Sequence, residues 1–263
     1  RVVIGTLDIN PLVSGNGVKA LKKAGIEVKV GILEKECIEL NKFFFKFIKN
    51  KHPYVTVKAA QTLDGMIADK NNYSEWISSS ESRKYVHWLR ARYDAVLIGS
   101  DTARKDNPKL TVRLIEGRNP YRVVLDSNLK LKNDLNIFKY SSDKKTIVIT
   151  SEKNKSKLRK IAQLKKFGVK VLFAKSDVQE RLQLKSVLKQ LAKLQIISLL
   201  VEGGSKIYSS FLKQKLFDDI FLFVSPKILG NGLKTFSEIE SKKLGDAVKL
   251  NIRRTQKIGD DLL

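Results

Sequence analysis

The sequence is poor in the residues that build metal sites and disulfides. Its 263 residues contain one cysteine, Cys37, and two histidines, His52 and His87. A single cysteine excludes an internal disulfide, and three soft ligands are too few for a structural zinc site, which needs four. We therefore expect chemistry that needs no bound metal.

Proline, glycine and long apolar runs are scarce as well. The chain has 5 Pro and 15 Gly, with 42% hydrophobic and 30% charged residues, which excludes collagen-like, low-complexity and disordered classes. No stretch approaches the roughly 20 apolar residues of a spanning helix, and the opening RVVIGTLD is typical of a strand rather than a signal peptide. We expect a cytoplasmic protein of one or two domains without membrane contact, large enough to be an enzyme.

Positive charge is the one feature in excess. The chain carries 51 Lys and Arg against 27 Asp and Glu, a net charge of +24, and 39 of the basic residues are lysines spread along its length. A scattered lysine coat is typical of a solvated surface, and it attracts phosphorylated small molecules through its long-range field. A nucleic-acid-binding protein stays open as an alternative of a different class, although clustered arginines and aromatic platforms are missing.

The first 50 residues read as a βαβα fragment. Residues 2–6 and 26–32 are predicted strands, and residues 18–24 and 34–49 are predicted helices, the first of them ended by Gly25. A domain that opens directly on a strand is unusual, so we interpret residues 1–50 as the tail of another domain; an extra layer on the following domain is the alternative. The boundary is expected at Pro53, because the residue before a proline disfavours helix.

Strands and helices alternate from Pro53 onward. Predicted strands span residues 55–60, 95–99, 122–126, 146–150, 169–173, 198–202 and 219–224, and predicted helices span residues 81–92, 155–167, 184–194 and 205–213. This alternation predicts an α/β fold with a mainly parallel sheet and helices on both faces.

The segment LLVEGGSKIYSSFL, residues 199–212, is the most suggestive for ligand binding. A strand ends at Glu202, Gly203 and Gly204 follow, and a helix opens at Ser205, so backbone N–H groups converge where an anion can bind. Glu202 lies at the carboxyl end of a strand, where open α/β sheets place ligands. The segment lacks the GxGxxG pattern, and simple turn chemistry is the competing interpretation.

Three further segments concentrate polar side chains: KAAQTLDGMIA (58–68), WISSSESRKYVHWLRA (76–91) and GSDTARKDNPKLTVR (99–113). Arg90, on the predicted helix of the second segment, can bind a phosphate bidentately. We interpret His87 and Cys37 as structural residues of the core and His52 as exposed.

Taken together, these segments resemble the reductase half of the bifunctional deaminase/reductase family of riboflavin biosynthesis. The resemblance rests on PYVTVKAAQTLDGMIA, SEWISSSESRKYVHWLRARYDAVLIGSDTARKDNPKLTVR, NPYRVVLDSNL and VEGGSKIYSSFLKQKLFDDIFLFVSPKILG. It implies a dihydrofolate-reductase-like domain over residues 51–263. It also implies that NADPH reduces 5-amino-6-(5-phosphoribosylamino)uracil to its ribitylamino product, by hydride transfer to C1′ of the ring-opened imine.

The resemblance further implies that residues 1–50 are the last part of a cytidine-deaminase-like domain. The His-x-Glu and Pro-Cys-x-x-Cys zinc motifs of such domains are not present in this sequence. We therefore expect no deaminase activity, with a separate deaminase polypeptide as a candidate partner.

The site residues follow from the resemblance. It implies cofactor contacts at Ala60, Trp76, Thr102, Asp106, Ser127, Gly204, Ser205, Lys206, Ile207, Tyr208, Ser209 and Ser210, and substrate contacts at Ser74, Arg90, Leu110, Arg113 and Glu202. Glu202 and Asp106 are the candidates for assisting ring opening or proton delivery, and Lys58 is the candidate for stabilising developing charge. The chain departs from the family pattern at Asn107, often Asp, and at Met66, often Lys or Arg.

Two other functions remain open. A reductase of the same fold acting on a pteridine or another imine is the closest rival, but a free pterin offers no phosphate to Arg113. A non-catalytic scaffold for a deaminase is the second. It is disfavoured because all the site positions implied by the resemblance are occupied by suitable residues. The resemblance and the apolar segment FDDIFLFV favour a homodimer.

Overall fold

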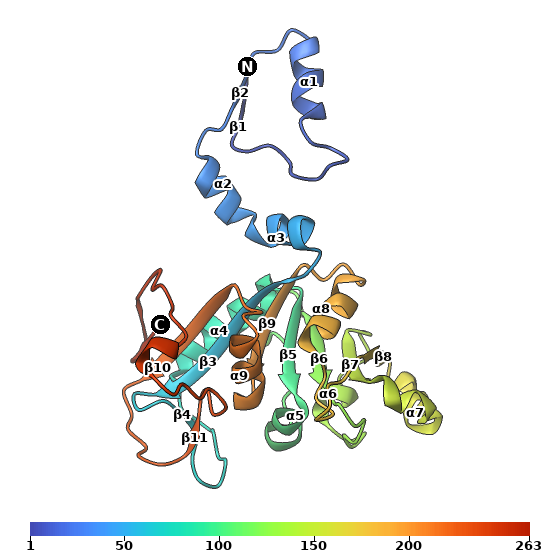
Figure 1. The fold of residues 1–263 in the computed structure, drawn as a ribbon, viewed down its shortest axis with the longest axis vertical. Helices are drawn as coiled ribbons and strands as arrows, with labels where there is room; N and C mark the ends of the chain where they lie inside the picture. The colour runs from blue at the N-terminus through green and yellow to red at the C-terminus, as the bar shows by residue number, and fades with distance from the viewer.

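A nine-stranded sheet forms the centre of the computed structural model, which describes residues 1–263 (Figure 1). Its strand order is β12-β13-β10-β3-β9-β5-β6-β7-β8. The strands from β10 to β8 run parallel, and the β13 and β12 hairpin adds an antiparallel edge. The strands are β3 (Tyr54–Thr62), β5 (Ala95–Gly99), β6 (Tyr121–Leu125), β7 (Thr146–Ser151), β8 (Lys170–Ala174), β9 (Ser198–Gly203), β10 (Asp219–Ser225), β12 (Lys257–Ile258) and β13 (Asp261–Leu262). The predicted mainly parallel sheet is confirmed.

Helices cover both faces because successive strand residues point to opposite sides. On β5, Leu97 joins the cluster under α8 (Leu184–Ala192) and α9 (Ser205–Lys213). Its neighbour Ile98 joins the cluster under α4, α5, α6 and α7. These helices are α4 (Ser80–Arg92), α5 (Ser100–Asp106), α6 (Asn136–Lys139) and α7 (Leu158–Lys166). None of the helices is long and apolar enough to cross a membrane.

Smaller elements complete the fold around the sheet. Strands β4 (Met66–Ala68) and β11 (Leu233–Lys234) pair antiparallel with each other. Two 3₁₀ turns, η1 (Glu152–Ser156) and η2 (Leu244–Asp246), lie in connections. Helix α5 and strand β4 were not among the predicted elements, since each is short and lies in a segment rich in polar residues. The predicted helix over 155–167 starts later, at Leu158, because η1 occupies its first turn.

Residues 1–50 form a separate group of elements, and Figure 1 shows all but the last of them away from the main sheet. The elements are β1 (Val2–Ile4), α1 (Asn16–Lys23), β2 (Val28–Val30), α2 (Glu34–Leu40) and α3 (Lys42–Asn50), and β1 pairs parallel with β2. The helix predicted over 34–49 is therefore two helices, divided at Asn41, whose backbone leaves the helical conformation at φ −106° and ψ 20°. Phe47 is the first buried side chain of the sequence.

Helix α3 is the part of this group that packs on the main sheet. The ring of Phe43 lies 5.2 Å from that of Tyr54 and 4.9 Å from that of Tyr93. Lys42 forms an ion pair of 2.9 Å with Asp219, at the start of β10. Aromatic contacts and charge together fasten α3 to the amino end of the sheet.

The amino ends of the central strands are tied by buried polar groups. Arg122, at the start of β6, is 1% exposed and bonds Asp143 with both terminal nitrogens and Thr146 with Nε. Asp94, just before β5, accepts hydrogen bonds from the backbone of Ile197 and from both the N–H and the hydroxyl of Ser198. These bonds fix the amino ends of the central strands relative to one another.

Candidate active site

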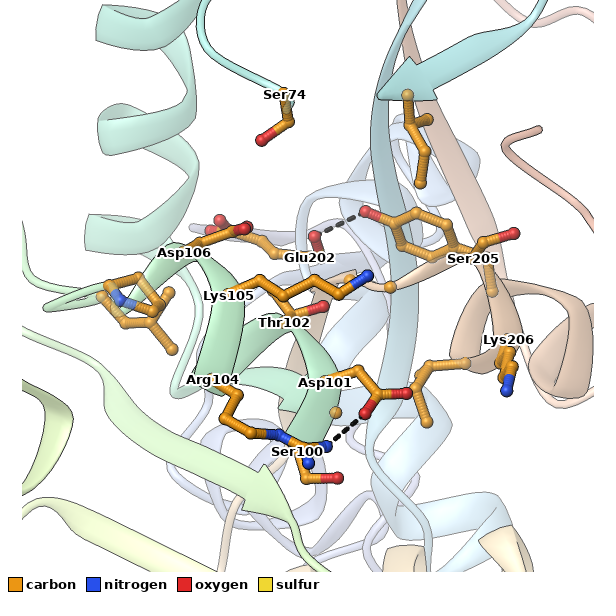
Figure 2. A pocket seen from close by; sticks show the side chains of 18 of the residues that line it. Ser74, Ser100, Asp101, Thr102, Arg104, Lys105, Asp106, Glu202, Ser205 and Lys206 are labelled. Carbon is orange, nitrogen blue, oxygen red and sulfur yellow. Dashed lines mark hydrogen bonds and ion pairs between the residues drawn. The ribbon is translucent and has the colours of Figure 1, made fainter. Parts of the chain in front are cut away.

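A cavity of about 1580 Å³ opens at the carboxyl ends of the parallel strands. Figure 2 shows Thr102 and Asp106 on α5, Glu202 on β9 and Lys206 on α9 around it. The predicted site residues that line this cavity are Lys58, Ala60, Ser74, Trp76, Arg90, Thr102, Asp106, Leu110, Arg113, Ser127, Glu202, Gly204, Ser205, Lys206, Ile207, Tyr208 and Ser210. Ser209 is the exception: it is fully buried, and its hydroxyl bonds the Ser205 carbonyl and the Glu238 N–H.

Gly203, the last residue of β9, and Gly204, just before α9, form a diglycine floor against Thr102 of α5. A Cβ at Gly204 would lie 2.8 Å from the Thr102 hydroxyl, and a Cβ at Gly203 would lie 3.3 Å from it. No residue with a side chain fits there without moving Thr102. The first residues of α9, Ser205, Lys206 and Ile207, line the cavity. The N–H groups of a first helical turn have no partner within the helix and are suited to phosphate groups.

Several hydroxyls near this turn are already engaged within the protein. The Ser205 hydroxyl donates to the Lys234 carbonyl at 2.6 Å and lies 2.7 Å from that of Ser237. The Tyr208 hydroxyl lies within hydrogen-bond distance of the carbonyl oxygens of Lys58 and Glu202. Tyr208 thus joins α9 to β3 and β9 and fixes the backbone of two of the predicted catalytic residues.

Arg90 and Glu202 form a two-bond ion pair at the base of the cavity. Arg90 Nε donates to Glu202 Oε1 at 2.7 Å and Nη2 donates to Oε2 at 2.6 Å. Burial alone would raise the pKa of Glu202, but the Arg90 guanidinium outweighs it and holds that pKa below its ordinary value. Glu202 is therefore ionised at neutral pH. Arg90 Nη1 also donates to the Thr111 carbonyl at 3.3 Å, so three of the five guanidinium N–H donors are engaged within the chain.

Arg113 is the arginine that stays free. Its side chain is exposed at the cavity and forms no hydrogen bond or ion pair within the chain. Partial burial and the nearby Arg90 cation lower the pKa of Arg113, while Glu202 opposes this shift. Of the two arginines predicted to bind a phosphate, Arg90 is paired with Glu202 and Arg113 has no partner in the chain.

Lys58 points its ammonium into the same region without a hydrogen-bond partner. Its Nζ lies 5.5 Å from the centre of the Phe223 ring. Burial lowers the pKa of Lys58, Arg90 adds to this effect, and Glu202 opposes it. A lysine in this setting releases its proton more readily than a solvated one.

Asp106, at the end of α5, differs from Glu202 in the direction of its pKa shift. Desolvation at the cavity and the neighbouring carboxylate of Glu75 raise its pKa. Two predicted catalytic carboxylates thus differ in kind, with Glu202 stabilised as an anion and Asp106 more easily protonated.

Trp76 also lines the cavity, and this residue is 60% exposed. The Arg83 guanidinium stacks 4.3 Å from the centre of the Trp76 ring, and Lys227 donates to the Trp76 carbonyl at 2.7 Å. These contacts fix an aromatic surface at the mouth, suited to a flat heterocycle.

Two residues of the site were not predicted as functional. His87, interpreted as a core residue, is indeed buried, but its Nδ1 accepts the backbone N–H of Arg113 at 2.9 Å. Asn107 holds its own loop to α6 through two bonds to Asn136, of 2.7 and 2.9 Å. The available signal for His87 was its spacing of three residues from Arg90, which places both on one face of α4.

No group of three or more His, Cys, Asp and Glu side chains is arranged to hold a metal ion.

Comparison with known proteins shows that this chain is similar to one family. Residues 53–263 match the RibD C-terminal domain. Over its whole length the chain is 42% identical to the riboflavin biosynthesis protein RibD of Aquifex aeolicus, of which it spans 71%.

Solved structures give the same result. A deaminase/5-amino-6-(5-phosphoribosylamino)uracil reductase of Thermotoga maritima is 40% identical, with a TM-score of 0.84 over 99% of this chain and 69% of that one. RibD of Acinetobacter baumannii is 30% identical, with a TM-score of 0.88 over 99% of this chain and 70% of that one.

Proposed function

Because the chain belongs to the RibD C-terminal domain family, the reductase domain of riboflavin biosynthesis, we propose that it reduces 5-amino-6-(5-phosphoribosylamino)uracil with NADPH. The product is 5-amino-6-(5-phosphoribitylamino)uracil. In this reaction the ribosylamine ring opens to an imine, C1′ gains a hydride, and the imine nitrogen gains a proton. NADPH, when bound, supplies the hydride.

The observation that carries the proposal is the free Arg113 guanidinium in the same cavity as Lys58 and Glu202. A guanidinium without a partner in the chain is suited to the 5′-phosphate of the substrate. Binding the phosphate at Arg113 anchors the flexible open chain, so that C1′ is held in place for the transfer.

Lys58, Glu202 and Asp106 have different roles in the proposed reaction. Glu202 stays ionised beside Arg90, so it accepts hydrogen bonds from the substrate and stabilises positive charge on the protonated imine. Lys58, whose pKa is lowered, is the better placed proton donor to the nitrogen. Asp106, with a raised pKa, can deliver a proton on the cofactor side during ring opening.

The cavity suits NADPH on two grounds. The diglycine floor and the start of α9 present backbone N–H groups to the pyrophosphate, with Lys206 beside them. The cavity is also lined by Lys130, by Arg104, which is paired with Asp101, and by Asp126, which accepts the Leu131 N–H at 2.9 Å. Lys130 has no ion-pair partner in the chain, so its charge is available to the additional phosphate that distinguishes NADPH from NADH.

The finer organisation of the chain belongs to the same proposal. Residues 1–50 are the last part of a deaminase-like domain and residues 51–263 the reductase. The chain itself has no deaminase activity, because it lacks a set of zinc ligands. We place the enzyme in the cytoplasm as a homodimer, with a separate deaminase polypeptide as a candidate partner and no specific nucleic acid.

The test is the loss of absorbance at 340 nm when the chain and NADPH are mixed with the ribosylaminouracil phosphate. Oxidation that depends on this substrate supports the proposal. NADPH binding without oxidation contradicts it, and parallel assays with dihydropterin substrates then test the reductase of the same fold that remains.

A further inference from the structure

We propose that His87 is a positioning residue for substrate binding, which sets the place of Arg113 by accepting its backbone N–H. This inference rests on the proposed function, since it concerns the residue that holds the substrate phosphate. His87 itself touches the loop rather than the reacting atoms.

The loop that carries Arg113 has no regular secondary structure from residue 107 to 113. Its backbone is instead held by side chains from elsewhere. The Val112 N–H donates to Asn119 at 2.8 Å, the Thr111 carbonyl accepts from Arg90 at 3.3 Å, and the Arg113 N–H donates to His87 at 2.9 Å. Of these three contacts, the bond to His87 acts on Arg113 directly.

His87 and Arg90 lie three residues apart on α4 and therefore share one helix face. One side chain of this pair holds the Arg113 backbone, and the other holds the catalytic carboxylate of Glu202. A single rigid helix thus fixes the distance between the phosphate-binding arginine and the reaction centre. Such support matters because a displacement of about 1 Å can cost a large part of the rate.

The bond specifies the chemical state of the imidazole. Nδ1 must carry no proton to accept the Arg113 N–H, so the ring is neutral with its proton on Nε2. The charged groups that face His87 are Arg90 and Arg113, which oppose protonation, and Glu202, which favours it. His87 is 3% exposed, and burial, the largest cause, together with the two arginines lowers its pKa to about 4. The acceptor form is therefore maintained at neutral pH.

The test compares His87→Leu, which removes the acceptor, with His87→Asn, whose amide oxygen lies close to the position of Nδ1. Lys84→Ala, an exposed residue on the same helix, is the matched control. We expect the leucine variant to raise KM for the ribosylaminouracil phosphate by about five- to tenfold, with kcat within twofold and Kd for NADPH unchanged. The asparagine variant should restore most of the loss.

Hydrogen exchange at the Arg113 amide gives a readout that does not depend on activity. Exchange should be faster in His87→Leu than in the wild type and His87→Asn, even if the wild type does not reduce the proposed substrate. Faster exchange in His87→Leu together with a wild type that does not reduce the substrate would refute the proposed function and still support the positioning of Arg113 by His87. If His87→Leu does not fold, His87→Met serves as a second apolar replacement. An unchanged KM with unchanged exchange, or a parallel loss of substrate and NADPH affinity in both variants, overturns the inference.

Discussion

Arg90 and Glu202 meet through two parallel hydrogen bonds, with side chains only 11% and 7% exposed. Their pairing means that the carboxylate is ionised and the guanidinium is engaged before any substrate arrives. Arg113 and Lys58 feel the charges of this pair and have no hydrogen-bond or ion-pair partner of their own, so both are available to a bound ligand.

Glu202→Gln should lower both stability and turnover. The substitution leaves the Arg90 charge buried without a partner, which costs about 3 kcal/mol of unfolding free energy. Urea unfolding measures this loss, and the 340 nm assay measures turnover. Glu238→Gln, which breaks the more exposed pair with Arg181, is the control and should cost under about 1 kcal/mol. Unchanged turnover in Glu202→Gln would remove this carboxylate from the mechanism.

Arg113→Ala should weaken substrate binding and spare the cofactor. Loss of a charged hydrogen-bond donor to the phosphate makes the free energy of substrate binding less favourable by roughly 1 to 3 kcal/mol, which is measured as a higher KM. Kd for NADPH, followed by fluorescence titration, should stay within twofold. Arg159→Ala, on an exposed face of α7 away from the cavity, controls for the loss of one positive charge. An equal loss of both affinities would point to misfolding.

Gly204→Ala should impair NADPH binding. The new Cβ would lie 2.8 Å from the Thr102 hydroxyl, so α5 or the α9 turn must move. Overpacking of this kind costs about 1 to 3 kcal/mol, and a rise in Kd for NADPH of about tenfold or more is expected. Gly245→Ala, where no atom lies within 4 Å of the added Cβ, should leave binding unchanged. Tight NADPH binding by Gly204→Ala would argue against the diglycine floor as the phosphate site.

Acid should destabilise the protein partly through His87. Its pKa is lowered from 6.5 to about 4 in the folded state, so between these values the unfolded chain binds a proton that the folded chain does not. The stability is fully present above pH 6.5 and is lost as the pH falls toward 4. Over this window the unfolding free energy of the wild type should change more steeply than that of His87→Asn, by up to about 1.4 kcal/mol per pH unit. Parallel curves for the two proteins would contradict the assignment.

The reductase should fold from residue 42 more stably than from residue 51. A chain of residues 51–263 loses the contacts of Phe43 with Tyr54 and Tyr93 and the buried Phe47, which together contribute roughly 3 kcal/mol. Residues 42–263 keep them, and no residue before Lys58 lines the cavity. Thermal unfolding and NADPH titration of the two chains check this expectation, and equal stability would show that α3 is dispensable.

The sequence predicted the parallel sheet and its helices because long apolar strands, such as β5, and amphipathic helices, such as α9, carry strong local patterns. It missed α5, because SDTARKD has no apolar stripe and its helix depends on packing of Ala103 under the sheet. The sequence did not predict the ion pair of Arg90 with Glu202 or the hydrogen bond from the Arg113 N–H to His87. Both contacts join α4 to chain segments far away in sequence, which no local pattern encodes.

The edge of the sheet at the amino ends of the strands differs from the edge at their carboxyl ends in how its charged side chains are paired. The two edges can therefore be changed separately by design. At the amino ends, Arg122 and Asp94 have their bonds satisfied within the chain, whereas at the carboxyl ends Arg113 and Lys58 do not. Substitutions at the first edge should shift melting temperature and leave catalytic constants alone. An engineer could therefore raise heat tolerance there without retuning the catalyst.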